Sequence, residues 1–289
     1  MNQHSLTASG GSEKVKFFTS LGRLYQSGSF RSGDLNYGRT NVRSNVDFDI
    51  NENLTIGLDL SYRKDKQSEP GQPQGNIYNA FIVSEPILPP VIPGRPELAA
   101  NSGGGFNNRA AYGTSQRSLS GFVDRFGEVF NGRIQMEYKI PQLKGLSVKG
   151  TLTYLSDNLQ TKDLNKRMQV YEYNKDTQEA IAVGQAGSDD LEESLRQFKR
   201  LYPTLSINYE NTFGDHEVKG LLLTETIDEE TIRFGGYRRD LLTTELPFLN
   251  LGSELGIQNS GDAIEFGRSS VVGRINYGYK NKYFLESSF

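Results

Sequence analysis

Apolar and polar residues alternate with a period of two along much of the chain, a pattern typical of β-strands with two different faces. In residues 41–50 the apolar side chains fall on one face, and the charged and amide side chains fall on the other. Residues 54–63 repeat the pattern after a three-residue polar turn at 51–53, which predicts a β-hairpin. The same alternation returns in residues 133–140, 146–154, 201–210 and 271–280.

The length of these segments separates two kinds of β-protein. The alternation persists for about ten residues, whereas strands in soluble domains usually stop near 5–6 and a tilted membrane-crossing strand needs roughly 9–11. Short turns at 10–13, 51–53, 141–145, 212–215 and 280–282 alternate with long connections at 27–38, 66–127, 158–197 and 231–263. A barrel with brief turns on one side and large loops on the other has this rhythm. We therefore predict an all-β chain that forms an antiparallel transmembrane β-barrel, with long extracellular loops at 66–127, 158–197 and 231–263.

Composition narrows the class of protein further. Only 35% of the residues are hydrophobic and no apolar run reaches 18 residues, which excludes a transmembrane helix but leaves barrel strands possible. The net charge is −3, from 32 basic and 35 acidic residues that are well mixed, so nothing favours nucleic acid as a partner. There is no cysteine and hence no disulfide framework. The first residues lack the basic and apolar regions of a signal peptide, so we expect a fragment of a longer exported protein.

The long connections have features of their own. Residues 66–127 contain seven prolines and the run Gly103–Gly105, which predicts an ordered loop or a flap rather than a strand. Residues 168–185 are predicted to form a hairpin within their loop, and residues 189–197 one or two helical turns.

Aromatic side chains in the first long connection are the best candidates for binding. Flat rings beside amides and a guanidinium suit a sugar or peptide that must be held and released, although loop aromatics also pack loops together. The substrate-binding candidates are Asn76, Tyr78, Phe81, Phe106, Asn108, Arg109 and Tyr112.

Metal and catalytic motifs are weak. Asp47, Asp49 and Asn51 imitate the start of a calcium-binding loop, but Glu52 replaces the required glycine and Leu58 the bidentate glutamate. The acidic runs at 189–190, 192–193 and 228–230 are typical of a solvated face. With His4 and His216 as the only histidines, we expect no metal site, no cofactor and no catalytic group. An alternative interpretation is a glycoside hydrolase on an all-β scaffold. It would need two catalytic carboxylates about 5–10 Å from each other, a distance that depends on the fold.

An ordered series of segments resembles one family. The segments are residues 3–11 (QHSLTASGG), 16–28 (KFFTSLGRLYQSG), 41–47 (NVRSNVD), 54–61 (LTIGLDLS), 273–283 (GRINYGYKNKY) and 285–289 (LESSF). In this order they resemble the barrel strands of SusC/RagA-like TonB-dependent transporters, while the long loops match nothing specific.

The resemblance implies an outer-membrane importer of oligosaccharides or peptides. A SusD-like surface lipoprotein would close over the barrel mouth, and TonB would act through a plug and TonB box absent from this chain. The chain would form about ten strands of a roughly 22-stranded barrel in outer-membrane lipid. The polar row expected to face the lumen, toward the plug or the solute, comprises Arg43, Asn45, Asp47, Asp59 and Arg63.

A second interpretation is a secreted or cell-surface β-sandwich that binds glycans as an adhesion module. Both architectures produce alternating strands, because a sandwich also has one apolar and one polar face. They differ in where the apolar rows lie: exposed to lipid in a barrel, stacked between two sheets in a sandwich.

Overall fold

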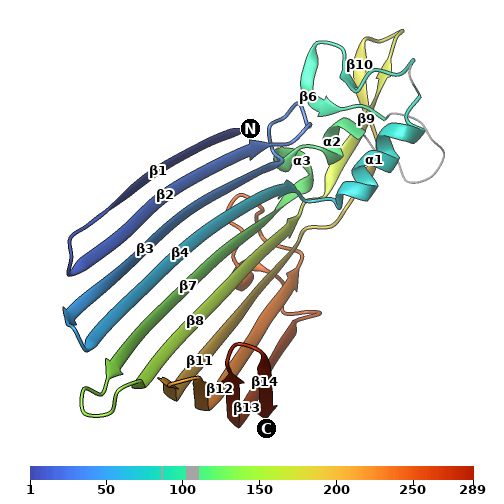
Figure 1. Cartoon of the computed structure of the whole chain (residues 1–289). Coiled ribbons are helices and arrows are strands. Elements are labelled where there is room, and N and C mark those ends of the chain that lie inside the picture. Colours follow the sequence, from blue (N-terminus) through green and yellow to red (C-terminus); the bar gives the residue numbers. More distant parts are fainter. Residues whose placement is uncertain (86, 102–110) are drawn as a thin grey trace.

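One long antiparallel sheet dominates the computed structural model, which describes residues 1–85, 87–101 and 111–289 (Figure 1). Its ten strands lie in chain order, each antiparallel to the preceding one. They are β1 (Asn2–Gly11), β2 (Val15–Ser27), β3 (Asn36–Asn51), β4 (Leu54–Pro70), β7 (Gly121–Lys139), β8 (Leu146–Asn165), β11 (Asp190–Phe213), β12 (His216–Arg239), β13 (Gln258–Tyr279) and β14 (Tyr283–Ser288). The predicted all-β antiparallel architecture is confirmed.

The remaining elements lie in the connections at one end of the sheet, here called the loop end; the opposite end, with the short turns, is the turn end (Figure 1). They are α1 (Gln74–Val83), β5 (Val91–Ile92), β6 (Arg95–Ala99), α2 (Ala111–Thr114), α3 (Arg117–Ser120), β9 (Met168–Asn174), β10 (Glu179–Ala186) and the 3-10 turn η1 (Leu249–Leu251). Among the helices of the described ranges, none has the length and apolar character needed to cross a membrane.

The short turns are fixed by local chemistry. At the predicted hairpin between β3 and β4, the Asn51 Oδ1 atom accepts hydrogen bonds from the backbone N–H groups of Asn53 and Leu54, at 2.9 and 3.0 Å. Between β7 and β8, Gly145 has a φ of +90°, and a Cβ atom there would overlap the Glu210 carbonyl oxygen. Glycine is the residue that adopts this backbone without a steric penalty.

The sheet has one apolar and one polar face. Side chains directly opposite each other on neighbouring strands share a face, so the register carries the apolar row across the sheet: Val46 lies opposite Leu58, and Leu58 lies opposite Ile134. We call this side the apolar face and the other side, which carries Asn45 and Asp59, the polar face.

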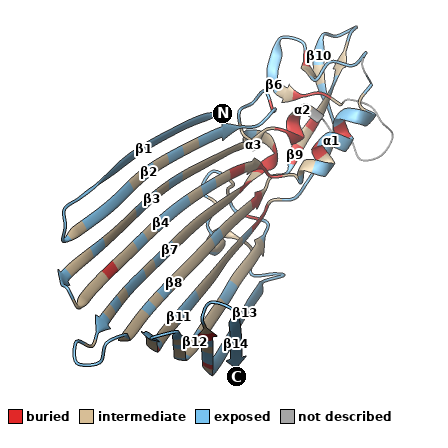
Figure 2. Cartoon of the chain, in the orientation of Figure 1, coloured by how far each residue is buried: buried red, intermediate tan, exposed pale blue. Residues whose placement is uncertain are grey.

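The apolar face is exposed rather than packed. Ile134 is 49% exposed and Val271 is 62% exposed. Most buried positions lie instead among the helices and connections of the loop end (Figure 2). A β-sandwich would bury these rows between two sheets, so the sandwich architecture is wrong for this chain.

Aromatic rings border the apolar face in two bands. Toward the loop end, Tyr62 lies opposite Phe130, whose ring centroid is 6.3 Å from that of Tyr154. Toward the turn end lie Tyr138, Tyr209 and Tyr277. From Phe130 to Tyr138 the strand rises about 26 Å at roughly 3.3 Å per residue, or about 20 Å along the normal for a strand tilted by about 40°. Aromatic belts flanking an apolar band of roughly 25 Å are typical of membrane-spanning barrels, and the layer here approaches that height.

The strands continue beyond the first band, so the connections are shorter than predicted. β4 and β7 leave residues 71–120 between them, β8 and β11 leave 166–189, and β12 and β13 leave 240–257. The helical turns predicted at 189–197 are wrong. Residues 190–197 belong to β11 instead, because strands on both sides satisfy their backbone groups despite a composition that does not alternate regularly. The predicted hairpin at 168–185 is confirmed as β9 and β10.

Two small apolar clusters organise the connections at the loop end. Ala99 of β6 packs with Met168 and Val170 of β9, which joins the two peripheral hairpins. The second cluster, comprising Leu164, Leu191, Leu241, Phe122 and Leu249, ties the 240–257 connection to the extended ends of β7, β8 and β11. Both clusters lie at the loop end, so this end is organised by packing as well as by the sheet.

Candidate functional site

Ion pairs and charge-assisted hydrogen bonds run across the polar face from strand to strand. They include Arg39–Asp65 at 2.8 Å, Arg196–Asp157 at 3.2 Å, Arg200–Glu229 at 2.7 Å and Arg233–Asp262 at 3.2 Å. The Tyr202 hydroxyl donates to Glu225 at 2.5 Å. Because most partners sit on neighbouring strands, the charges are fixed in position but remain accessible to water and solutes.

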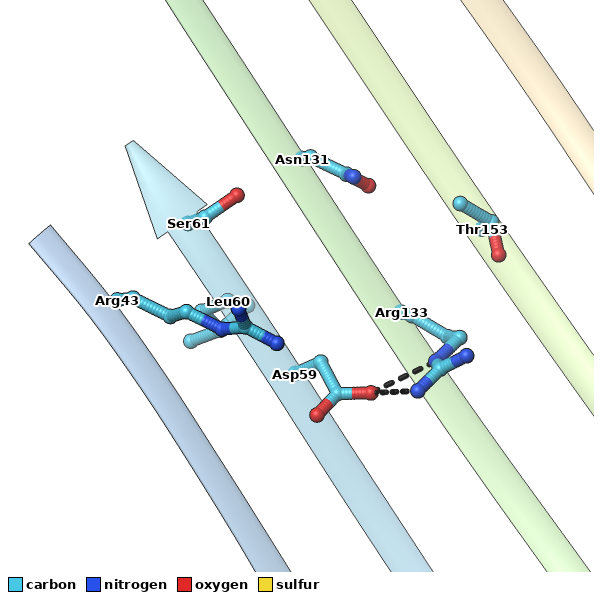
Figure 3. Close-up of a pocket in the computed structure, with 7 residues that line it drawn as sticks. All are labelled: Arg43, Asp59, Leu60, Ser61, Asn131, Arg133 and Thr153. Carbon is cyan, nitrogen blue, oxygen red and sulfur yellow. Dashed lines mark hydrogen bonds and ion pairs between the residues drawn. The ribbon is translucent and has the colours of Figure 1, made fainter. Parts of the chain in front are cut away.

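A hollow of about 400 Å³ lies on this face between β3, β4, β7 and β8 (Figure 3). Asp59 is its centre: the Arg133 Nε atom donates to Asp59 at 2.7 Å, and the Asn45 amide also donates to Asp59. The Arg43 Nε atom donates to the Asn45 Oδ1 atom at 2.9 Å, which completes a chain across three strands. The lining is Arg43, Asp59, Leu60, Ser61, Asn131, Arg133 and Thr153.

The five residues predicted to face the lumen all lie on the polar face. Arg43, Asn45 and Asp59 meet at the hollow, while Arg63 pairs with Asp65 at 2.7 Å. Asp47 is exposed and lies opposite Gly57.

The sequence interpretation did not select Asn131, Arg133 and Thr153, which line the same hollow. Arg133 and Thr153 already stood in the polar rows of their segments, so alternation could have identified their face. Alternation could not identify which residues lie beside them, because the neighbours are set by the register between β4, β7 and β8.

The loop candidates that the structure describes lie at the loop end. Asn76, Tyr78 and Phe81 are on α1, and Tyr112 is on the neighbouring α2. Tyr78 and Phe81 are exposed, and the Tyr78 ring lies 6.1 Å from that of Phe30. Phe106, Asn108 and Arg109, and the run Gly103–Gly105, lie outside the described residues. The structure therefore places four of the seven candidates near one another.

One carboxyl group on the polar face, that of Asp163, has a buried oxygen atom without a hydrogen-bond partner. Asp163 follows Tyr154 by nine positions on β8, so it lies beyond the aromatic band at the loop end. Its Oδ1 atom is buried and accepts no hydrogen bond in the structure. Burial, with Glu192 and Asp190 nearby, raises the pKa of Asp163 to about 6. Within the described ranges, His, Asp and Glu side chains form no group of three that could hold a metal ion.

Comparison with known proteins identifies the architecture. No family model matches the chain. TonB-dependent receptor P39 of Formosa agariphila is 25% identical over 99% of this chain, and TonB-dependent receptor P3 of the same organism is 26% identical over 96%. The chain is a homologue of TonB-dependent receptors over nearly its whole length. The relationship to TonB-dependent receptors expected from the strand segments is confirmed, as is the outer-membrane location.

Solved structures give the same fold for the receptor chain. A chain of the RagAB peptide transporter matches 99% of it with a TM-score of 0.74 at 18% identity. The outer-membrane transporter YddB from Escherichia coli matches with a TM-score of 0.54 at 9% identity. The receptor chain covers about a quarter of the length of its two relatives, and 31% of the matched RagAB chain. Its ten-stranded sheet therefore matches part of the barrel of such a transporter.

Proposed function

We propose that the chain forms part of the barrel wall of a TonB-coupled importer, which takes up oligosaccharides or peptides with the help of a SusD-like lipoprotein. The observation that carries this proposal is the contrast between the two faces of one sheet. The exposed apolar face with its aromatic bands suits lipid, and the ladder of paired charges suits the border of a water-filled passage.

The nature of the cargo rests on two supports. The resemblance of the strand segments to SusC/RagA-like transporters implies oligosaccharides or peptides, and the RagAB complex, whose fold the chain shares, is a peptide transporter. A pairing of this receptor with a surface lipoprotein follows from the same resemblance. The exposed rings of Tyr78 and Phe81 lie at the loop end, where cargo or lipoprotein would first meet the receptor.

The hollow around Asp59 is the proposed contact with the plug or with solute on its way through. Its guanidinium, amide and hydroxyl groups offer both donors and acceptors, as the backbone of a plug or a passing peptide requires. Arg133 and Arg43 supply donors, while Asp59 supplies the acceptor.

Uptake by whole cells tests this proposal. Cells that carry the full-length receptor are expected to accumulate fluorescent short peptides or oligosaccharides, and to stop doing so when TonB is deleted. Asp59→Asn is expected to lower the uptake rate several-fold, because the amide no longer pairs with Arg133 as a carboxylate does. Asp228→Asn, the same change at an exposed residue on the opposite face, serves as the control. Uptake that persists without TonB would refute the proposal.

A further inference from the structure

A second hollow, of about 290 Å³, lies on the polar face near the loop end, between β11, β12 and β13. Two rows of aligned residues form it. Glu192, Tyr237 and Gln258 lie opposite one another across the three strands. Two residues along, Ser194 and Ser260 flank Gly235. Since Gly235 has no side chain, the middle of the hollow is backbone that a ligand can approach closely.

The polar groups of this hollow are unpaired. Throughout the described part of the chain, the structure gives no side-chain hydrogen bond or ion pair to Glu192, Gln258 or the Tyr237 hydroxyl. Most charged residues of the polar face nearer the aromatic bands are in pairs, such as Arg233 with Asp262. A recess whose donors and acceptors are all available can receive a polar ligand, unlike a wall whose charges neutralise one another.

The hollow also carries negative charge without a matching cation. Glu192 lies directly opposite Asp163, whose buried Oδ1 atom has no hydrogen-bond donor. The guanidinium groups nearby already have carboxylate partners. Arg125 lies 3.1 Å from Glu69, Arg233 pairs with Asp262, and Arg239, two residues from Tyr237, lies 3.7 Å from Asp240. Two neighbouring carboxyl groups therefore lack a positive partner.

A ligand that completes this site must be positively charged and rich in donors. An ammonium or guanidinium group would donate to Glu192, bring the missing cation close to Asp163, and lie against the Tyr237 ring, where a cation is attracted to the face of the aromatic system. A neutral sugar would leave the charge uncompensated, and an anionic one would be repelled. These observations favour a peptide with a basic group over an oligosaccharide.

We propose that the hollow formed by Glu192, Ser194, Gly235, Tyr237, Gln258 and Ser260 binds the basic side chain or terminal ammonium of a peptide. This inference rests on the proposed importer function and assigns it a substrate class. The site would hold a basic group on the barrel wall near the loop end, ahead of the hollow around Asp59 on the way toward the turn end.

Binding of trilysine to the full-length receptor in detergent tests the proposal by titration calorimetry. The unaltered receptor is expected to bind trilysine and not trialanine. Glu192→Gln keeps the shape of the side chain and removes its charge, so the affinity for trilysine is expected to fall about tenfold, the effect of one lost charge-assisted hydrogen bond. Tyr237→Leu is expected to weaken binding several-fold through loss of the ring.

Glu265→Gln is the matched control, because Glu265 is exposed on the apolar face of β13 and has the same charge to lose. It is expected to leave the affinity unchanged. Equal losses from Glu192→Gln and Glu265→Gln would overturn the site, as would a folded receptor that binds a neutral trisaccharide but no trilysine. Either of those results would leave the importer function standing, since TonB-dependent uptake is measured separately.

Discussion

An arginine at position 134 tests which face of the sheet meets lipid. Ile134 is on the apolar face of β7, four residues from Phe130 and four from Tyr138. It is therefore about 13 Å along the strand from each aromatic band, which for a tilt of about 40° places it roughly 10 Å from each interface. Position 134 is close to the middle of the hydrocarbon layer.

The expected cost of Ile134→Arg follows from this depth. An arginine on the lipid face near the midplane of a barrel destabilises it by about 2–4 kcal/mol, and the loss falls to about 0–1 kcal/mol near the interfaces. Gln135→Arg is the matched control, because residue 135 is the next position on the same strand and lies on the polar face. A surface change of that kind is expected to alter stability by about 0.5 kcal/mol or less.

The assay is urea titration of the full-length receptor folded into lipid vesicles, with the folded fraction followed by its heat-modifiable migration on gels. We expect the Ile134→Arg midpoint to fall clearly below that of Gln135→Arg. Equal losses, or a larger loss at position 135, would show that the apolar face does not meet lipid.

Two further predictions concern the loop end. Asp163→Asn is expected to stabilise the receptor by about 1–2 kcal/mol at pH 7.5, a value reduced from the full pKa difference because Asp163 is partly exposed to solvent. Below pH 4 the substitution is expected to change the stability little. The reason is that the raised pKa lets the folded state keep the Asp163 proton up to about pH 6. The unaltered receptor therefore loses stability as the pH rises from about 4 through 6. Urea midpoints of both proteins across that range test this, and a difference between them that does not depend on pH would contradict it. Leu191→Ala, at a residue with no exposed surface, is expected to cost about 2–5 kcal/mol and to speed hydrogen exchange in residues 240–257, whereas Leu242→Ala, at a residue that is 84% exposed, should do neither.

Local sequence pattern is enough to find the central segments of several strands and to assign the two faces of the sheet. A period of two assigns each side chain to a face as soon as a strand is recognised, which is why Arg43, Asn45 and Asp59 were placed on one side from the pattern alone. The turn at 51–53 was equally local, since the Asn51 side chain caps it. Both conclusions depend on neighbours in the chain and needed no knowledge of distant contacts.

Which distant residues meet depends on how the strands pair in the assembled sheet. Asp59 and Arg133 are far apart in the sequence, and their pairing depends on the register between β4 and β7. Residues 189–197 look helical in isolation, yet from Asp190 onward they pair with β8 on one side and β12 on the other. The row of Glu192, Tyr237 and Gln258 likewise comes from three strands. Alternation fixes the face of a side chain, but the position along a neighbouring strand is set by hydrogen bonding across the whole sheet, which a single sequence does not specify.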